Sequence, residues 1–173
     1  MTVAVAKSTV LFFFAVIVQV TIVSSIGILG GSPDLVLVLL VAVSLSTGSI
    51  FGAFSGFWAG LVLDIAQLGT LGFTSLLLTL AGFWIGRYGE TTGRGRPYAA
   101  PLSAFAITLL AAPANVALHF LLGQPVSAQA AFATLIPSAI VNGLLAFGLH
   151  PLLRRYLARA DRLPPRPREV GLV

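Results

Sequence analysis

Two long stretches of this chain carry no positive charge. No Lys or Arg lies between Lys7 and Arg87. No charged residue of either sign lies between Arg96 and Arg154. Each stretch is much longer than the roughly 20 residues that one helix needs to cross a bilayer. Only 9% of the residues are charged, against about 25% in a typical soluble domain, and 57% are hydrophobic. The chain is therefore predicted to be an integral membrane protein with several crossings.

Clusters of Gly, Ser, Pro and Gln divide the apolar sequence into helices. The predicted helices span residues 8–29, 33–47, 49–67, 73–86, 101–122 and 131–153. They predict an all-α fold, a polytopic membrane protein whose six transmembrane helices form one bundle over residues 1–153. Two alternatives stay open: the second and third segments form one long helix, or the first segment is a cleaved signal peptide.

The basic residues suggest an orientation for this bundle. With six crossings, Lys7, the loop from Arg87 to Arg96 and the segment 154–173 all fall on one side of the membrane. Cytoplasmic loops carry an excess of Lys and Arg, so both termini are predicted to be cytoplasmic. Five crossings would instead place Lys7 and the loop on opposite faces.

The segment 154–173 differs in composition from the rest of the chain. It contains six arginines, two acids and three prolines, and it is too polar to bury a core. We expect a cytoplasmic tail that is attracted to anionic lipids. An acidic protein partner is the alternative, whereas nucleic acid is not expected because membrane topology already accounts for the basic residues. The predicted lipid-surface residues are Arg154, Arg155, Arg159 and Arg162.

The sequence Ser32-Pro33-Asp34 precedes the second predicted helix. It has the pattern of an N-cap serine, a first-turn proline and a first-turn acid. An acid near a helix N-terminus is favoured by the helix dipole. We therefore interpret Pro33 and Asp34 as a helix start rather than as a binding site.

Small residues recur at every fourth position of the third predicted helix. Gly48, Gly52, Gly56 and Gly60 share a slowly winding face, and Asp64 follows one step later. Small residues at this spacing let helix backbones approach closely in lipid. We expect a groove formed by Gly52, Gly56, Gly60 and Asp64 that receives a partner helix; the first or fourth helix of the same chain is the alternative occupant. A carboxylate within a membrane segment is a candidate functional residue.

The inventory of reactive side chains is small. The chain has no cysteine, and no Walker A, Rossmann, zinc or catalytic-triad spacing is present, so no cofactor, metal or catalytic residue is predicted. Asn115 and His119 are four residues apart on the fifth predicted helix and could line a polar pocket with Asn142 of the sixth. Hydrogen bonds between helices are the simpler interpretation of these three residues.

One region resembles a known family, the rod shape-determining protein MreD. The resemblance lies in the Pro33–Leu35 start of an apolar run and in residues 56–64, GFWAGLVLD, which Gly69 and Gly72 follow. Members of that family typically have a P-D-L-like start and a G-x-x-x-G-L-x-x-D segment that leads to a glycine-marked helix. These signatures fall within residues 33–87, and the length and six-helix plan also agree.

The resemblance implies a non-enzymatic scaffold in the bacterial inner membrane. Similar proteins bind MreC and act with MreB, a SEDS-type glycosyltransferase and a class B penicillin-binding transpeptidase in sidewall peptidoglycan synthesis. The MreD fold is thought to resemble the substrate-capture subunits of energy-coupling-factor vitamin transporters. A vitamin-capture subunit is therefore the second hypothesis, and an intramembrane enzyme ranks last because Asp64 has no obvious catalytic partner.

Overall fold

The computed structural model describes residues 2–21, 32–68, 70–93, 96, 98–123 and 132–160. All regular secondary structure in these residues is helical, which confirms the all-α prediction. Each of the six predicted segments contains one long helix. The elements are α1 (Thr2–Thr21), α2 (Leu35–Thr47), α3 (Ser49–Ala66), α4 (Phe73–Tyr88), the short π-helix η2 (Gly89–Gly93), α5 (Ala99–Leu121) and α7 (Leu135–Ala160).

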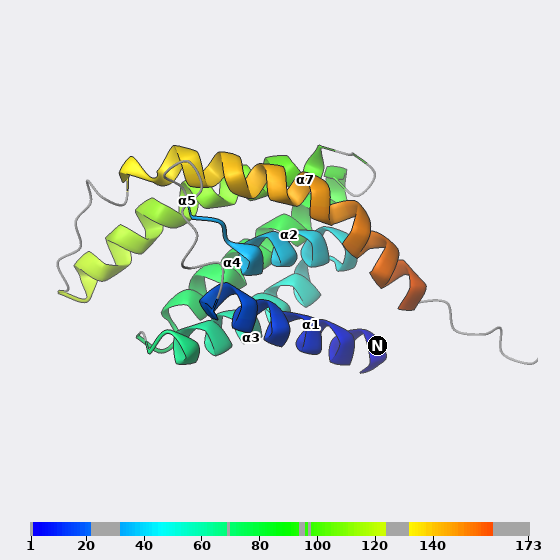
Figure 1. Cartoon of the computed structure of the whole chain (residues 1–173), viewed down its shortest axis with the longest axis horizontal. Coiled ribbons are helices and arrows are strands. Elements are labelled where there is room, and N and C mark those ends of the chain that lie inside the picture. The colour runs from blue at the N-terminus through cyan, green and yellow to red at the C-terminus, as the bar shows by residue number, and fades with distance from the viewer. Residues whose placement is uncertain are drawn as a thin grey trace, which may run out of the picture.

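Helix α2 forms the centre of the bundle. Every residue from Val36 to Leu45 is buried, and a helix that is apolar on all sides is typical of a protein core or a membrane span. Helix α2 contacts α1, α3, α4, α5 and α7. In Figure 1 it lies between α7 and α5 on one side and α1 and α3 on the other. Its 13 residues span about 20 Å, less than the roughly 30 Å of a hydrocarbon core.

Within the described residues, two helical segments are long and apolar enough to cross a membrane by themselves, Ser49–Ala66 of α3 and Leu135–Leu153 of α7. The apolar parts of α1, α2 and α5 are shorter by the same measure. Six crossings therefore remain a prediction. Large apolar side chains cover much of the outer surface, among them Ile50, Phe120 and Leu144.

Two predicted boundaries need correction. Helix α7 continues to Ala160, whereas the sequence predicted that the helix ends at residue 153 and the tail begins at residue 154. Arginine, leucine and alanine are good helix formers, and the nearest following prolines are Pro164 and Pro165. Arg154, Arg155 and Arg159 thus belong to the last turns of α7. Arg162 and the rest of the predicted tail lie outside the described residues.

The N-terminal helix is also shifted. Helix α1 begins at Thr2, six residues before the predicted start, because Lys7 is accommodated within the helix. The predicted end at residue 29 falls in the segment 22–31, which lies outside the described residues.

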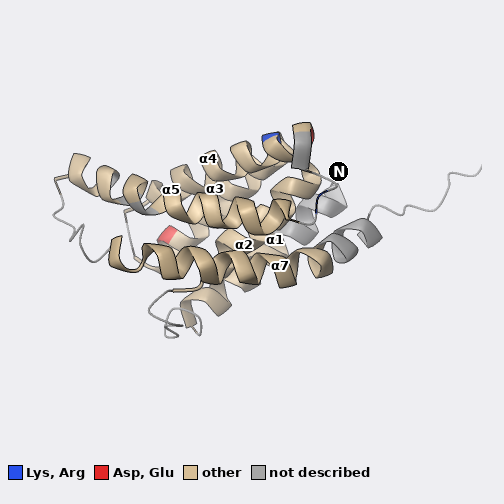
Figure 2. Ribbon diagram, turned by 90° about the horizontal axis from the view of Figure 1, so that it is seen from above, with Lys and Arg blue, Asp and Glu red and all other residues tan. Residues whose placement is uncertain are grey.

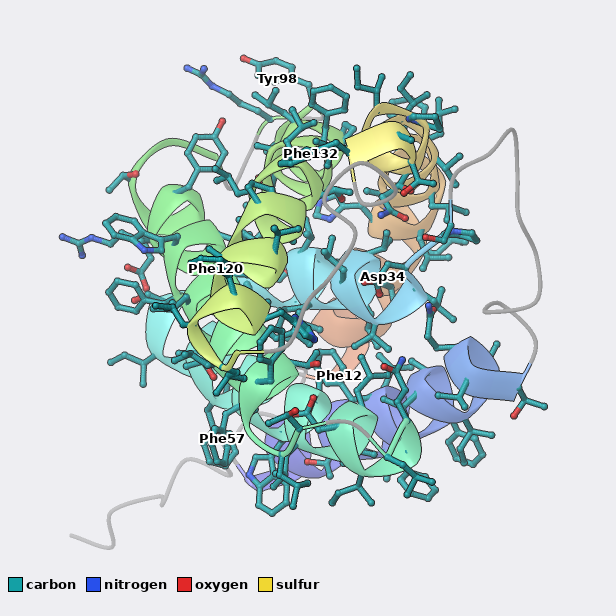
Figure 3. All side chains as sticks on the ribbon, turned by 90° about the vertical axis from the view of Figure 1, so that its left-hand side faces the viewer. Phe12, Asp34, Phe57, Tyr98, Phe120 and Phe132 are labelled. Carbon is teal, nitrogen blue, oxygen red and sulfur yellow. The ribbon has the colours of Figure 1, made fainter. Side chains whose placement is uncertain are left out.

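The described basic residues are concentrated toward one end of the bundle. In Figure 2 the described Lys and Arg residues lie toward the end that holds the N-terminus, whereas an acidic segment lies toward the other end. We call these the basic end and the distal end. Helices α2, α4 and α7 begin at the distal end, as Figure 3 shows in a view along the bundle with Asp34 labelled on α2.

Candidate functional site

Helices α3 and α4 pack backbone against backbone through small residues, and they form the most extensive helix pair among the described elements. A Cβ atom added at each of three glycines of α3 would overlap with the α4 backbone. The overlapping pairs are Gly52 with the Gly82 carbonyl, Gly56 with the Leu78 carbonyl and Gly60 with the Ser75 Cα. Gly82 and Gly86 of α4 meet the backbone of α3 in the same way. The small faces of the two helices are therefore complementary.

The predicted partner-helix groove is thus occupied from within the chain. We predicted that a neighbouring protein inserts a helix along Gly52, Gly56 and Gly60, and this prediction is wrong because α4 fills the groove. Helix α4 follows α3 after a short loop, so it reaches the glycine stripe Gly52, Gly56 and Gly60 at a high effective concentration. It also has small residues of its own at the contact. The sequence had left the first or the fourth helix of the same chain as the alternative occupant of this groove, and the structure places the fourth there.

Asp64 caps helix α4 from the neighbouring helix. Its side chain is only 3% exposed. Its Oδ2 accepts hydrogen bonds from the Gly72 amide at 2.9 Å and the Ser75 amide at 3.4 Å, and its Oδ1 accepts from the Thr74 amide at 3.1 Å. The first amides of a helix lack partners within the helix, and Gly72 at the N-cap has no side chain to satisfy them. Asp64 therefore stabilises the hairpin rather than lining a partner groove.

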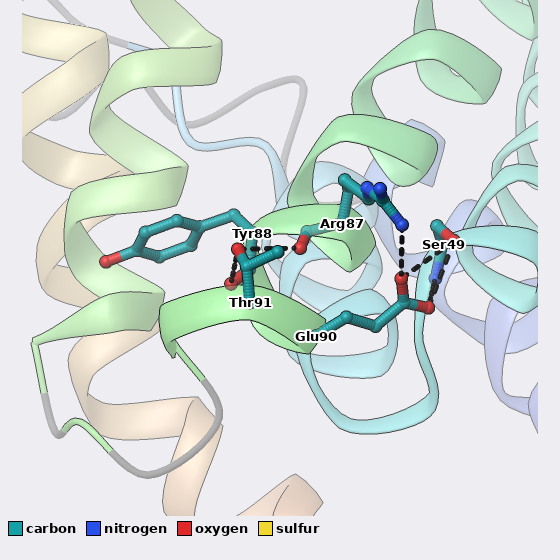
Figure 4. A network of polar contacts seen from close by, with 5 residues as sticks. All are labelled: Ser49, Arg87, Tyr88, Glu90 and Thr91. Carbon is teal, nitrogen blue, oxygen red and sulfur yellow. Dashed lines mark hydrogen bonds and ion pairs between the residues drawn. The ribbon is translucent and has the colours of Figure 1, made fainter.

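Glu90 makes the corresponding contact at the opposite end of the hairpin (Figure 4). Its Oε1 accepts hydrogen bonds from the Ser49 amide at 2.8 Å and the Ser49 hydroxyl at 3.0 Å. Ser49 is the first residue of α3, and its N-cap Gly48 again has no side chain. Glu90 was not predicted from the sequence. A signal was available, because the N-cap of α3 is a glycine without a capping side chain and Glu90 follows α4.

The start of α2 is fixed by residues from other helices. Asp34, rather than Ser32, is the N-cap, and its Oδ1 accepts a hydrogen bond from the Leu37 amide at 2.9 Å. The Asp34 amide donates to Asn142 Oδ1 of α7 at 2.7 Å. Ser32 instead donates its amide to Ser138 Oγ at 3.0 Å. The chain before α2 is therefore attached to α7.

Gln19 of α1 attaches the same segment from another side. Its Nε2 donates to the Pro33 carbonyl at 3.1 Å, and its Oε1 accepts from the Leu35 amide at 2.8 Å. These bonds satisfy backbone groups that would otherwise be costly in an apolar environment. The sequence interpretation missed Gln19, although a glutamine in the apolar run of α1 was a signal of such a contact.

Two of the three predicted pocket residues, Asn142 and His119, have described side-chain contacts. Asn142 is 1% exposed and donates from Nδ2 to Thr108 Oγ1 at 3.1 Å. The His119 ring packs edge-on against the Phe73 ring, with their centroids 4.6 Å apart. The side chain of Asn115 lies outside the described residues. Asn142 joins α7 to α5 and to the start of α2, as interhelical hydrogen bonding predicts.

A polar cavity opens near Asn142 at the distal end of the bundle. Its volume is about 320 Å³, and α2, α4, α5 and α7 form its walls. Leu37, Leu77 and Leu78 provide part of its apolar lining. Its polar lining includes Asp34, Thr74, Thr108, Ser138 and Asn142. We call this space the distal cavity; Asp34 is the charged side chain among its described lining residues.

The fold and these contacts define an apolar helical bundle of the membrane-protein class, in which polar groups mainly cap helices and join them. The family model for the rod shape-determining protein MreD matches residues 2–160, and the chain belongs to this family. This match confirms the resemblance found in residues 33–87 and extends it from α1 to the end of α7. No curated protein and no solved structure shows significant similarity to the chain.

Proposed function

We propose that this protein is a non-catalytic scaffold or regulator of the machinery that elongates rod-shaped bacterial cells. The family match over residues 2–160 carries this proposal, since it includes every described helix and connects the chain to rod-shape determination. In this proposal the protein also binds MreC and helps to organise peptidoglycan synthesis. MreB, a SEDS glycosyltransferase and a class B penicillin-binding transpeptidase complete the proposed assembly.

The environments of the acidic residues support a scaffold rather than an enzyme. Asp34, Asp64 and Glu90 each satisfy backbone amides at a helix start. Among the described residues, no group of three His, Cys, Asp or Glu side chains could hold a metal ion. In the proposed function, chemistry belongs to the partner enzymes, and this protein positions them.

The proposed location is the bacterial cytoplasmic membrane, with several crossings and both termini in the cytoplasm. The basic end would then face the cytoplasm and contact anionic lipids, as the positive-inside bias predicts. Arg87 is exposed at that end, where it pairs with Glu90 at 3.7 Å. The distal end, including Asp34, would face the periplasm.

Because α4 fills the glycine stripe, we propose that MreC binds to an outer surface. One candidate face lies on α1 and α3 and exposes Phe13, Phe54 and Trp58. Another lies on α7 and exposes Leu144 and Phe147. Exposed apolar surface in a membrane contacts lipid by default, so the choice between these faces requires a direct measurement.

Photocross-linking would make that measurement in cells that contain MreC. A photoreactive phenylalanine analogue is placed at Trp58 in one variant and at Phe147 in another. Cross-linking to MreC from one face but not the other would support the proposal and locate the contact. If neither position, nor Phe13 and Leu144 in matched variants, cross-links to MreC, these faces are not its binding surface.

Complementation tests the function itself. A rod-shaped bacterium depleted of its own MreD-family protein loses its shape, and expression of this chain together with its cognate MreC is expected to restore rods. Co-purification of the two proteins from the same cells tests their binding. Round cells despite normal amounts of both proteins in the membrane would contradict the proposal.

The distal cavity favours a second candidate, a substrate-capture subunit of a vitamin transporter. A volume of about 320 Å³ lies at the lower end of the roughly 300–1,000 Å³ typical of small-molecule sites. Native mass spectrometry of gently purified protein separates the two candidates. A retained vitamin would support capture, whereas retained MreC without a vitamin would support the scaffold.

A further inference from the structure

The distal cavity is enclosed by segments that are far apart in the sequence. Asp34 lies at the start of α2, Thr74 in the first turn of α4, Thr108 in α5, and Ser138 and Asn142 near the start of α7. Several of these groups are joined by hydrogen bonds: Asn142 donates to Thr108 Oγ1 and accepts from the Asp34 amide. The cavity is therefore lined by polar groups from several helices beside its larger apolar surface.

The charge in this wall is negative. Asp34 is the charged side chain among the described lining residues, and its carboxylate contacts backbone amides at the start of α2. The positive end of a helix dipole corresponds to about half an elementary charge, so it offsets only part of one carboxylate. An ionised Asp34 would therefore favour a cation in the cavity and disfavour an anion.

The described lining of the cavity contains no Lys or Arg. No Lys or Arg occurs between Lys7 and Arg87, and none occurs between Arg96 and Arg154. All segments that form the cavity walls come from these two stretches. The described cavity lining therefore offers no positive counter-charge to Asp34.

The other polar groups of the wall indicate the type of cation. An alkylammonium group has three donors and no acceptor, so it requires several acceptor oxygens. The carboxylate of Asp34 and the hydroxyl oxygens of Thr74 and Ser138 are acceptors on three different helices. The leucines of α2 and α4 provide apolar surface for a carbon chain attached to the ammonium group. A quaternary ammonium group has no N–H donor and would fit these acceptors less well.

We propose that the distal cavity binds a protonated primary amine, with the carboxylate of Asp34 as its counter-charge. The amine has two chemical sources, a small free amine or the headgroup of phosphatidylethanolamine. This inference goes beyond the proposed scaffold function and holds whether or not MreC is bound.

Binding of the free amine is tested on the purified full-length protein in detergent. Its thermal unfolding is followed while ethanolamine is added, with ethylene glycol as the uncharged control and glycolate as the anionic control. Ethanolamine is expected to raise the unfolding temperature in a saturable manner, and neither control is expected to do so.

The lipid source is tested in nanodiscs. Native mass spectrometry compares protein from phosphatidylethanolamine bilayers with protein from phosphatidylcholine bilayers, whose headgroup is a quaternary ammonium. Selective retention of phosphatidylethanolamine supports the lipid as the source, and saturable ethanolamine binding supports a free amine. If neither amine binds selectively, the proposal is wrong.

The variant Asp34→Asn separates charge from folding. Asparagine caps helices about as well as aspartate, so α2 is expected to keep its start. Removal of a charged hydrogen-bond partner is expected to weaken amine binding about tenfold or more. The matched control Glu90→Gln changes a carboxylate that caps α3 at the opposite end of the hairpin, outside the described cavity lining, and it is expected to leave amine affinity unchanged.

A second variant tests the hydroxyl contribution without altering charge. Thr74→Val keeps the shape of the side chain and the Thr74 amide that Asp64 holds. It is expected to weaken amine binding by a smaller factor than Asp34→Asn. Unchanged amine affinity in a folded Asp34→Asn protein would overturn the proposal, whatever the Thr74 variant shows.

Discussion

Gly56 illustrates how a single atom decides which helices pack together. A glycine inside a helix costs about 1 kcal/mol relative to alanine in water, so a row of glycines is unfavourable unless it permits a contact that alanine would prevent. At Gly56 that contact is the backbone of Leu78 in α4. The absence of a side chain at this position allows the two helix backbones to meet.

Replacing Gly56 with alanine should destabilise the protein. The new Cβ would overlap with the Leu78 carbonyl, so α3 and α4 would have to separate, at a cost of about 1–3 kcal/mol. Thermal unfolding in one detergent measures the effect. Gly148→Ala in α7 is the matched control, because nothing lies within 4 Å of its added Cβ. Equal unfolding temperatures for the two variants would contradict the observed packing.

Asp64 is expected to be more sensitive to truncation than to a conservative change. Asp64→Ala leaves three amides of the first turn of α4 without their acceptor, and each buried unsatisfied donor costs about 1–3 kcal/mol. Asp64→Asn retains one acceptor oxygen and should lie between wild type and Asp64→Ala in thermal unfolding. A wild-type unfolding temperature for Asp64→Ala would exclude this role.

At the scale of secondary-structure elements, α3 and α4 form a hairpin that is closed at both ends. Asp64 follows the glycine stripe of α3 and caps α4, whereas Glu90 follows α4 and caps α3. Each acid satisfies the backbone amides that a glycine N-cap leaves without a side-chain acceptor. The hairpin therefore combines backbone packing along its length with a carboxylate at each end.

The two caps should act independently. Helix α4 has 16 residues, so the caps lie about 24 Å apart along its axis. Substitutions this distant usually add within about 0.5 kcal/mol. The shifts in unfolding temperature from Asp64→Ala and Glu90→Ala should therefore sum in the double variant, with the smaller share from the exposed Glu90. A double variant no less stable than Asp64→Ala would show that the caps are coupled.

At the scale of the whole molecule, the two ends of the bundle differ in chemistry. The basic end carries Arg87 and the first residues of the chain, and the distal end carries Asp34, Asp64 and the polar cavity. The proposed orientation places the distal end outside the cytoplasm. The absence of cysteine from the natural sequence makes this orientation directly measurable.

Single cysteines at the two ends should react differently with a membrane-impermeant maleimide. Leu68 is 93% exposed in the loop after α3 at the distal end, and Thr91 is exposed in η2 at the basic end. In spheroplasts, Leu68→Cys is expected to be labelled, and Thr91→Cys only after the membrane is permeabilised. The cysteine-free parent is the control. The reverse pattern would invert the orientation, and labelling of both would contradict six crossings.

Much of the fold could be predicted because helices leave local signals. Apolar runs and Gly or Pro breaks located all six long helices, and α2, α3 and α4 begin or end within about two residues of their predicted bounds. The end of α7 was missed because arginine-rich sequence continues a helix as readily as it forms a tail. The candidate site was harder to predict, since Gln19, Glu90 and Thr108 act through residues distant in the sequence.

The sequence by itself determined the apolar composition that favours lipid, the long helices, the clustering of the basic residues and the presence of a small face on α3. These properties follow from local composition and spacing. Only the tertiary structure decided that α4 fills that face, that Asp64 caps α4, and that residues from 34 to 142 enclose one cavity. The physical reason is that a glycine stripe accepts any helix with a complementary small face, and a carboxylate accepts any nearby donor. The choice among such partners depends on the simultaneous packing of all the helices.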